Sequence, residues 1–237
     1  MDNIGKLIEN VLQMYRQNSA GRPPSKLTGR LSSLRREELL SCLRTIYADR
    51  ASSLQSTFLD DDFIEDKMKR LVTWLCSSER PGLLFYGRVG TGKTTMLESL
   101  KILLRCDTPS RSVASVSATQ ITLDYKLGMA NSGLCGLGTY DHARNAGILL
   151  LDDLGCEPSA RSFGVDYQPI CDLICYRYAY QMPTIITTNL GDEQLRAEYG
   201  ERVWDRIIGS YDTIVFDRES YRRRREKQEE TNDNNES

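Results

Sequence analysis

The chain has 237 residues, of which 40% are hydrophobic, 27% are charged and 8% are aromatic, and these values exclude wholesale disorder and collagen-like repeats. At about 100–200 residues per domain, the length suits one full domain with an appendage, or two small domains. The formal net charge of -2 argues against a protein that coats nucleic acid by bulk charge, although it leaves room for a local basic patch.

The first fifty residues are predicted to form two helices joined by a linker. Apolar residues repeat at intervals of three and four within residues 3–16, as on one face of a helix. Residues 16–29 contain glycines and two adjacent prolines and are predicted as the linker. A second helix follows, with Leu39, Leu43 and Ile46 on its apolar side.

Residues 1–55 are therefore expected to be a helical segment that binds a partner. Within residues 1–50, nine lysines and arginines stand against five acidic residues, which favours an acidic partner surface or nucleic acid. A solvated helical face is the alternative reading of the same charges. The segment contains no zinc-binding pattern.

The sequence carries no pattern typical of export or of a membrane span. Charged residues interrupt the stretch from Met1 to Asn10, unlike a secretory signal, and no apolar run reaches the roughly 18–20 residues of a spanning helix. The seven cysteines include no Cys-x-x-Cys pair, which favours reduced thiols over a disulfide framework or a zinc ribbon. We therefore expect a cytoplasmic protein without a membrane partner.

From about residue 58 the pattern becomes that of an α/β domain. Three aspartates, 60–62, precede an apolar helical face that runs from Ile64 to Leu75, as at a helix N-terminus. After Pro81, short apolar runs alternate with helix-like stretches, and each run is typical of a strand buried on both faces. These runs cover residues 82–86, 112–116, 148–151, 184–188 and 213–216.

The alternation predicts a five-stranded, mostly parallel sheet flanked by helices. We assign residues 56–225 to this domain. Residues 226–237 form a polar tail that is expected to be disordered.

The residues after the first predicted strand match the pattern G-x-x-x-x-G-K-[ST]. Glycines let the backbone wrap closely around phosphates, and the following helix presents the positive end of its dipole. Lys93 is expected to reach the β- and γ-phosphates, and the Thr94 hydroxyl to ligate magnesium. A glycine-rich turn without a ligand is the alternative. The predicted nucleotide-binding residues are Gly87, Gly90, Thr91, Gly92, Lys93, Thr94 and Thr95.

A second motif places two acids, Asp152 and Asp153, directly after an apolar run. A buried strand cannot hold two carboxylates in its interior, so we expect them at its C-terminal edge, where ligands of open α/β sheets bind. Asp152 would hold magnesium directly or through water, and Asp153 would polarise the attacking water. Two solvated carboxylates at a strand end are the alternative.

Another predicted strand ends in Thr187-Thr188-Asn189. In a functional reading, Asn189 or Thr188 directs a side-chain dipole toward the γ-phosphate or the attacking water. In the plainer reading, these are strand residues followed by a turn former. The two preceding motifs favour the functional reading, because they predict that a polar group is needed at this edge.

These motifs, in this order, resemble the AAA+ ATPases, and within them the DnaC/IstB group of replicative helicase loaders and transposition helper ATPases. The resemblance covers roughly residues 80–225. It implies a P-loop AAA+ core without the usual helical lid, hydrolysis of ATP with Mg²⁺, and assembly into a homo-oligomer on ATP binding. The residues that carry it are 87–95, 150–155, 176–178, 183–190, 199–206 and 220–222.

The same resemblance implies that Arg206 is an arginine finger, which enters the ATP site of the adjacent subunit. Arg202 lies one helical turn earlier and would contact the phosphates or the interface. Arg177 would likewise face the nucleotide or a neighbouring subunit. Exposed ion pairs on a surface helix are the alternative for Arg202 and Arg206.

Members of the initiator and loader branch carry a helical insertion after the second strand that is implicated in contact with single-stranded DNA. The corresponding stretch here, about residues 118–145, contains Tyr125, Lys126, Tyr140 and Arg144. Aromatic rings beside cations would suit a single strand. An ordinary packed pair of helices explains the same residues.

The sequence thus predicts an ATP-hydrolysing DNA-replication protein of the helicase-loader type, which acts on a replicative helicase and single-stranded DNA. Two alternatives remain open. One is a transposition helper that binds DNA with ATP and recruits a transposase. The other is a nucleotide-switch adaptor that binds ATP and hardly hydrolyses it.

Overall fold

The computed structural model describes residues 34–53, 62–77, 79–107, 112–130, 137–158, 160–162 and 165–221. The helix predicted for residues 3–16, the linker over 16–29 and the tail over 226–237 lie outside the described residues. The chain divides into two compact units. The first takes its described residues from 1–79, 87–109 and 215–237, and the second takes them from 80–86 and 110–214.

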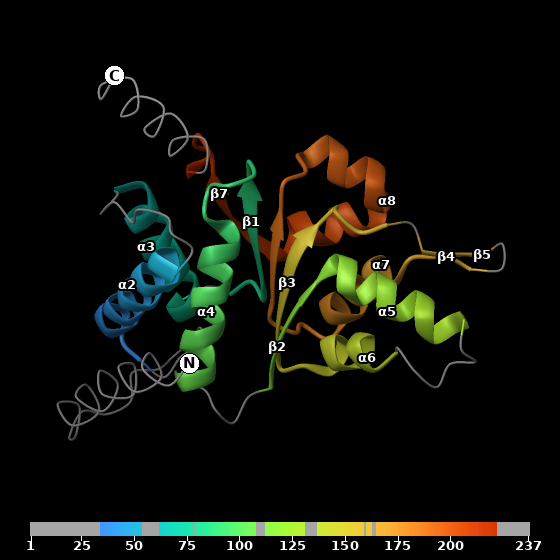
Figure 1. Ribbon diagram of the computed structural model, residues 1–237, viewed down its shortest axis with the longest axis horizontal. Helices are drawn as coiled ribbons and strands as arrows, with labels where there is room; N and C mark the ends of the chain where they lie inside the picture. Colours follow the sequence, from blue (N-terminus) through green and yellow to red (C-terminus); the bar gives the residue numbers. More distant parts are fainter. Residues whose placement is uncertain are drawn as a thin grey trace, which may run out of the picture. The chain divides into compact units, whose positions relative to one another are not determined.

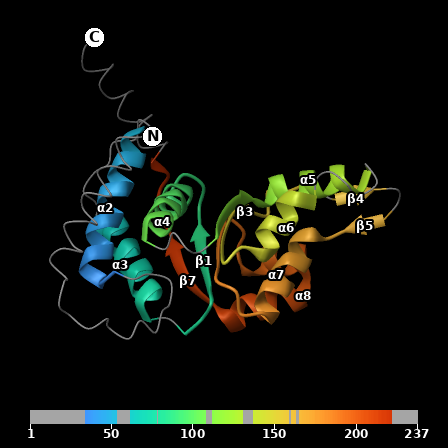
Figure 2. The ribbon, with the colours of Figure 1, turned by 90° about the horizontal axis from the view of Figure 1, so that it is seen from below.

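The first unit contains three helices, α2 (Arg36–Ser53), α3 (Asp62–Ser77) and α4 (Lys93–Asp107). Helix α2 packs against both of the others (Figure 2). Its predicted apolar side is buried, with Leu39, Leu43 and Ile46 each 0% exposed. The side chain of Glu38 caps the helix by accepting the backbone N–H of Arg35 at 2.9 Å, as in a capping box.

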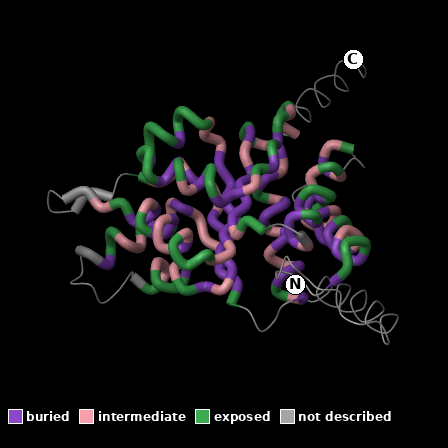
Figure 3. The backbone as a smooth tube through the Cα atoms, turned by 180° about the vertical axis from the view of Figure 1, so that it is seen from behind, coloured by how far each residue is buried: buried purple, intermediate pink, exposed green. Residues whose placement is uncertain are grey.

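A five-stranded, all-parallel sheet forms the basis of the second unit, with strand order β2-β3-β6-β1-β7 (Figure 1). All five predicted strands are confirmed, and most positions of the three central ones are buried, in the middle of the molecule's purple core (Figure 3). Continuous apolar runs are what a strand covered on both faces requires. The strands are β1 (Gly82–Gly87), β2 (Val113–Ser117), β3 (Ile148–Leu154), β6 (Thr184–Thr188) and β7 (Tyr211–Phe216).

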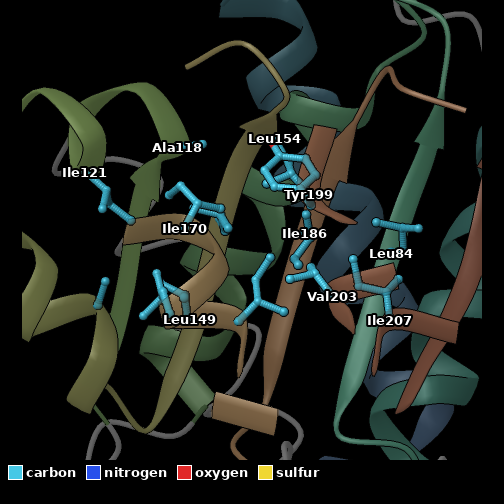
Figure 4. Close-up of a cluster of buried hydrophobic side chains, with 14 of the residues drawn as sticks. Leu84, Ala118, Ile121, Leu149, Leu154, Ile170, Ile186, Tyr199, Val203 and Ile207 are labelled. Carbon is cyan, nitrogen blue, oxygen red and sulfur yellow. The ribbon is translucent and has the colours of Figure 1, made fainter. Parts of the chain in front are cut away.

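Four helices of the second unit lie on one side of this sheet (Figure 1, Figure 2). Their apolar residues meet those of the strands in one core, which includes Leu149 and Ile186 from the strands and Ile170 and Val203 from the helices (Figure 4). The helices are α5 (Ala118–Ala130), α6 (Leu137–Asn145), α7 (Pro169–Ala179) and α8 (Asp192–Ser210).

Helix α8 is interrupted at Gly200, whose φ of 79° and ψ of 164° are not helical. The helix therefore consists of two segments, and the second carries Arg202 and Arg206. Such a backbone conformation is essentially restricted to glycine. Gly200 thus marks the start of the helical segment that carries Arg202 and Arg206.

A short antiparallel hairpin, β4 (Ala160–Ser162) with β5 (Val165–Tyr167), was not predicted. Strands of three residues contain too few positions for an apolar pattern to show. The structure describes the chain after β7 as far as Tyr221. Within the described ranges, every helix is too short or too polar to cross a membrane.

Candidate nucleotide site

The glycine-rich loop connects β1 to α4, and its lysine is turned inward. Lys93, the first residue of α4, is 5% exposed, and its Nζ donates to the backbone carbonyls of Gly87 and Arg88 at 2.6 and 2.7 Å. The buried Thr91 hydroxyl also donates to the Arg88 carbonyl, at 2.8 Å. The loop therefore holds a buried positive charge at the N-terminus of a helix, where backbone N–H groups favour anions.

Two glycines of this loop adopt conformations that other residues avoid, with φ of +77° at Gly90 and +97° at Gly92. A Cβ at Gly92 would lie 2.6 Å from the Tyr47 hydroxyl of α2, so this helix closely approaches the loop. The Gly90 carbonyl accepts the backbone N–H of Tyr221 at 2.9 Å. Within the first unit, α2 and the segment after β7 therefore both lie next to the loop.

The predicted acids lie in the second unit, at the C-terminal end of β3. Asp152 and Asp153 are half-buried, and Asp153 has a positive φ of 54°. The Thr187 hydroxyl donates to Asp152 Oδ1 at 2.5 Å and accepts the backbone N–H of Asp153 at 2.9 Å. Thr187 lies in β6, which pairs directly with β3. The acids therefore lie near the C-terminal end of this strand, as the sequence predicts.

Asn189 follows β6 immediately and is half-buried. The residue before it, Thr188, pairs with Leu154 of β3 on one side and with Tyr86 of β1 on the other. The ends of β3 and β6 thus bring Asn189 to the same edge of the sheet as the two acids. Thr188 itself is fully buried, and its hydroxyl donates to the Leu154 carbonyl at 2.7 Å.

Arg206 lies in the second segment of α8 and is half-buried. Its guanidinium carbon lies 5.4 Å from the centroid of the Tyr178 ring, within the range of a cation–π contact. Its Nη1 is buried and has no hydrogen-bond partner. Arg202 is exposed, and Glu201 pairs with Arg196 at 3.2 Å. The guanidinium of Arg206 therefore retains an unused donor.

Arg177 was expected to face the nucleotide or a neighbour, and this expectation is wrong. The side chain is 0% exposed, and burial lowers its pKa to about 10. Its guanidinium donates to Thr184 Oγ1 at 2.8 Å and to the Pro183 carbonyl at 2.6 Å. Three further bonds reach the carbonyls of Ala143, Arg144 and Ala146. The guanidinium therefore faces inward, and Arg177 connects α7 to α6 and β6.

Helices α5 and α6 lie within the stretch of residues 118–145, and two tyrosines of this stretch pack against each other. The rings of Tyr125 and Tyr140 are 5.2 Å apart at 67°, an edge-to-face arrangement. Arg144 lies 3.9 Å from the ring of Tyr176 rather than in open solvent. Lys126 is exposed. The packed pair of helices that the sequence allowed is thus present.

Some contacts at the site were not expected from the sequence. The Glu157 side chain accepts the Gly155 backbone N–H at 2.9 Å and a short bond from the Tyr199 hydroxyl, and burial together with this bond raises the pKa of Tyr199. The bond from Thr187 to Asp152 was not expected either. Only the strand register, which a single sequence does not show, places these residues opposite each other.

Comparison with models of known protein families finds no match, and no curated protein is similar in sequence at a significant level. Solved structures do match. A candidate primosome component from Streptococcus pyogenes serotype M3 has a TM-score of 0.52 and 20% identity, with 68% of this chain and 84% of that chain covered. The DnaC helicase loader has a TM-score of 0.49 and 22% identity, with 67% and 93% covered.

AMPPCP-bound DnaA from Aquifex aeolicus has a TM-score of 0.51 and 16% identity. The match covers 67% of this chain and 48% of that one, so the chain spans about half the length of that DnaA structure. At these identities the likeness concerns the fold. The predicted architecture is confirmed: this chain shares the fold of AMPPCP-bound DnaA and of the primosome component, with a five-stranded parallel sheet flanked by helices.

Proposed function

We propose that this protein is an ATP-hydrolysing helicase loader, which assembles with copies of itself and delivers a replicative helicase to single-stranded DNA. The observation that carries the proposal is the glycine-rich loop. It holds the buried Lys93 ammonium on two loop carbonyls at the start of α4, beside two glycines of positive φ. Phosphate oxygens fit this loop, because charged acceptors bind an ammonium more strongly than carbonyls do. The order of the other motifs supports the loader assignment.

The residues of the site divide the work of hydrolysis. Lys93 and the backbone of residues 87–95 would hold the phosphates of ATP, and Thr94 and Asp152 would hold Mg²⁺. Magnesium, when bound, neutralises charge that develops on the phosphate oxygens. Asp153 would accept a proton from a water molecule while the water oxygen attacks the γ-phosphorus. The bond between the γ-phosphorus and the β–γ bridging oxygen would then break to give ADP and phosphate.

Asn189 and Arg206 would complete this arrangement. Asn189 would orient the γ-phosphate or the attacking water. Arg206 would enter the site of the next subunit and donate to a phosphate oxygen there. An arginine finger typically contributes about 10³–10⁵ in rate, so a lone subunit should be a poor ATPase.

Binding of a fluorescent ATP analogue, with and without magnesium, tests the nucleotide site. Lys93→Ala should abolish magnesium-dependent binding, because it removes the buried ammonium of the loop. Lys101→Ala on the same helix is the matched control, since Lys101 pairs with Glu98 at 3.2 Å, outside the loop. A wild-type chain without affinity for magnesium and ATP would contradict the proposal.

Affinity capture from the native host, with and without ATP, tests the partner. Recovery of the replicative helicase supports the loader. Recovery of a transposase together with ATP-dependent binding of duplex DNA would identify a transposition helper instead. Tight ATP binding with negligible turnover in the presence of DNA and partner would identify a nucleotide-switch adaptor.

A further inference from the structure

Strand β3 contains a bulge at the two acids. In the pairing of β3 with β6, Leu151 lies opposite Ile186 and Leu154 lies opposite Thr188. Asp152 and Asp153 therefore stand opposite the single residue Thr187, which is the definition of a β-bulge. The φ of 54° at Asp153 belongs to this irregularity. Bulges commonly redirect side chains next to active sites.

One side chain spans the bulge. The Thr187 hydroxyl donates its only proton to Asp152 Oδ1 at 2.5 Å and accepts the Asp153 backbone N–H at 2.9 Å. The residue is 0% exposed. These two bonds fix the rotation of the Asp152 carboxylate and the backbone of Asp153 together. Because threonine is β-branched, its χ1 angle is restricted and the hydroxyl is held in place.

Packing alone does not explain a hydroxyl at this position. A buried strand of this kind would accommodate valine, which has the same shape and avoids the cost of burying a polar group. The neighbouring Thr188 differs, because its hydroxyl bonds the Leu154 carbonyl and Leu190 N–H and touches neither acid. The polar contacts of Thr187 are therefore directed at the two predicted functional acids.

We propose that Thr187 is a positioning residue of the ATPase site. It holds the Asp152 carboxylate in the orientation that binds magnesium, and it fixes the backbone conformation that directs the Asp153 side chain. The inference rests on the proposed function and deepens it. Thr187 itself touches neither nucleotide nor metal in this scheme. Loss of a side chain that orients a metal ligand typically costs about 10–100-fold in metal affinity or activity.

The test compares Thr187→Val and Thr187→Ala, which lack the hydroxyl, with Thr187→Ser, which keeps it. Thr122→Val is the matched control, because Thr122 is also buried and its Oγ1 has no hydrogen-bond partner. We expect both hydroxyl-free variants to lower kcat by about 10–100-fold and to need more magnesium, with KM for ATP changed less than about threefold. Thr187→Ser should recover most of the rate.

A second measurement needs no nucleotide. Hydrogen exchange of the peptide that contains Asp153 should be faster in Thr187→Val than in wild type, since the amide loses its acceptor, while thermal unfolding monitors folding. Unchanged kcat and magnesium requirement in both hydroxyl-free variants, or equal loss in Thr187→Ser, would overturn this inference alone. Wild-type protein that binds no magnesium and ATP would overturn the proposed function, and this inference with it.

Discussion

Arg177 shows how strongly one buried side chain can determine local structure. Its five hydrogen bonds satisfy carbonyls at the end of α6 and before β6, and the Thr184 hydroxyl, around a fully buried guanidinium. Replacement by lysine keeps the charge but loses the planar fork that fits several acceptors at once. We expect Arg177→Lys to lower the free energy of unfolding by about 2–4 kcal/mol, as measured by urea denaturation.

The control for this prediction is Arg202→Lys, because Arg202 is exposed in the same unit. Its free energy of unfolding should stay within about 0.5 kcal/mol of wild type. An equal loss in both variants would show that the bonds of Arg177 do not matter specifically. The sequence could not reveal this role, since a lone arginine between two tyrosines gives no sign of burial. Thr187 was hidden for a related reason, because its partners depend on strand register.

Among the secondary-structure elements, the strands were predictable because each is a continuous apolar run, and the loop was predictable because its glycines and Lys93 have fixed spacing. The break in α8 at Gly200 was not, since a single glycine within a helical pattern is often tolerated. Because of this break, two glycines of the same helix, Gly200 and Gly209, differ in backbone conformation. A Cβ added at either Gly200 or Gly209 would meet only open space, but only Gly200 has a positive φ.

We therefore expect opposite signs for two similar substitutions. Gly200→Ala should destabilise the protein by about 1–3 kcal/mol, because alanine rarely adopts that backbone conformation. Gly209→Ala should stabilise it by up to about 1 kcal/mol through helix propensity. Chemical denaturation of both variants checks this. A stabilising effect of Gly200→Ala would show that the break at Gly200 is not retained in solution.

Helix α2 and the glycine-rich loop are coupled through Tyr47 and Gly92. In Gly92→Ala the new methyl group would meet the Tyr47 hydroxyl, and the φ of +97° would be strained in addition. Tyr47→Phe removes the steric part only. A double-mutant cycle on the free energy of unfolding should show that Gly92→Ala costs about 0.5–3 kcal/mol less in the Tyr47→Phe background. A coupling of zero would mean that α2 does not touch the loop in solution.

At the level of the entire protein, buried and half-buried thiols and phenols predict a loss of stability in alkali. Burial raises the pKa of Cys42 and Cys171 from 9.0 to about 11, and that of Tyr140 and Tyr211 from 10.0 to about 12. In the unfolded chain these groups ionise near their ordinary values, so the unfolded state releases protons first. The stability they contribute is complete below about pH 9 and is lost as pH rises toward 12.

Urea denaturation at a series of pH values checks this prediction. The free energy of unfolding should be flat from pH 7 to about pH 9 and should then fall. Tyr140→Phe removes one of the contributing groups, so its curve should fall less steeply between about pH 10 and pH 12. Parallel curves for the variant and the wild type would contradict the raised pKa of Tyr140.

The proposed role of Arg206 requires that subunits assemble, because the guanidinium acts in the site of a neighbouring subunit. Arg206→Ala subunits keep their own acids but contribute no guanidinium to the neighbouring site. Asp153→Asn subunits contribute Arg206 to the neighbouring site but cannot activate water in their own. Each variant alone should hydrolyse ATP poorly. Because an arginine finger acts on the neighbouring subunit, a mixture should exceed the sum of the two separate rates, with a maximum at an intermediate ratio.

Steady-state phosphate release over a series of mixing ratios measures this effect. The control is the double variant Asp153→Asn/Arg206→Ala, which neither contributes a guanidinium to a neighbouring site nor activates water in its own. Mixing it with Arg206→Ala should therefore restore no ATP hydrolysis. Arg206 acting on its own subunit would give rates equal to the sum at every ratio. The mixing curve therefore separates a site completed by a neighbour from one completed within a single chain, since only the former responds to which subunits meet.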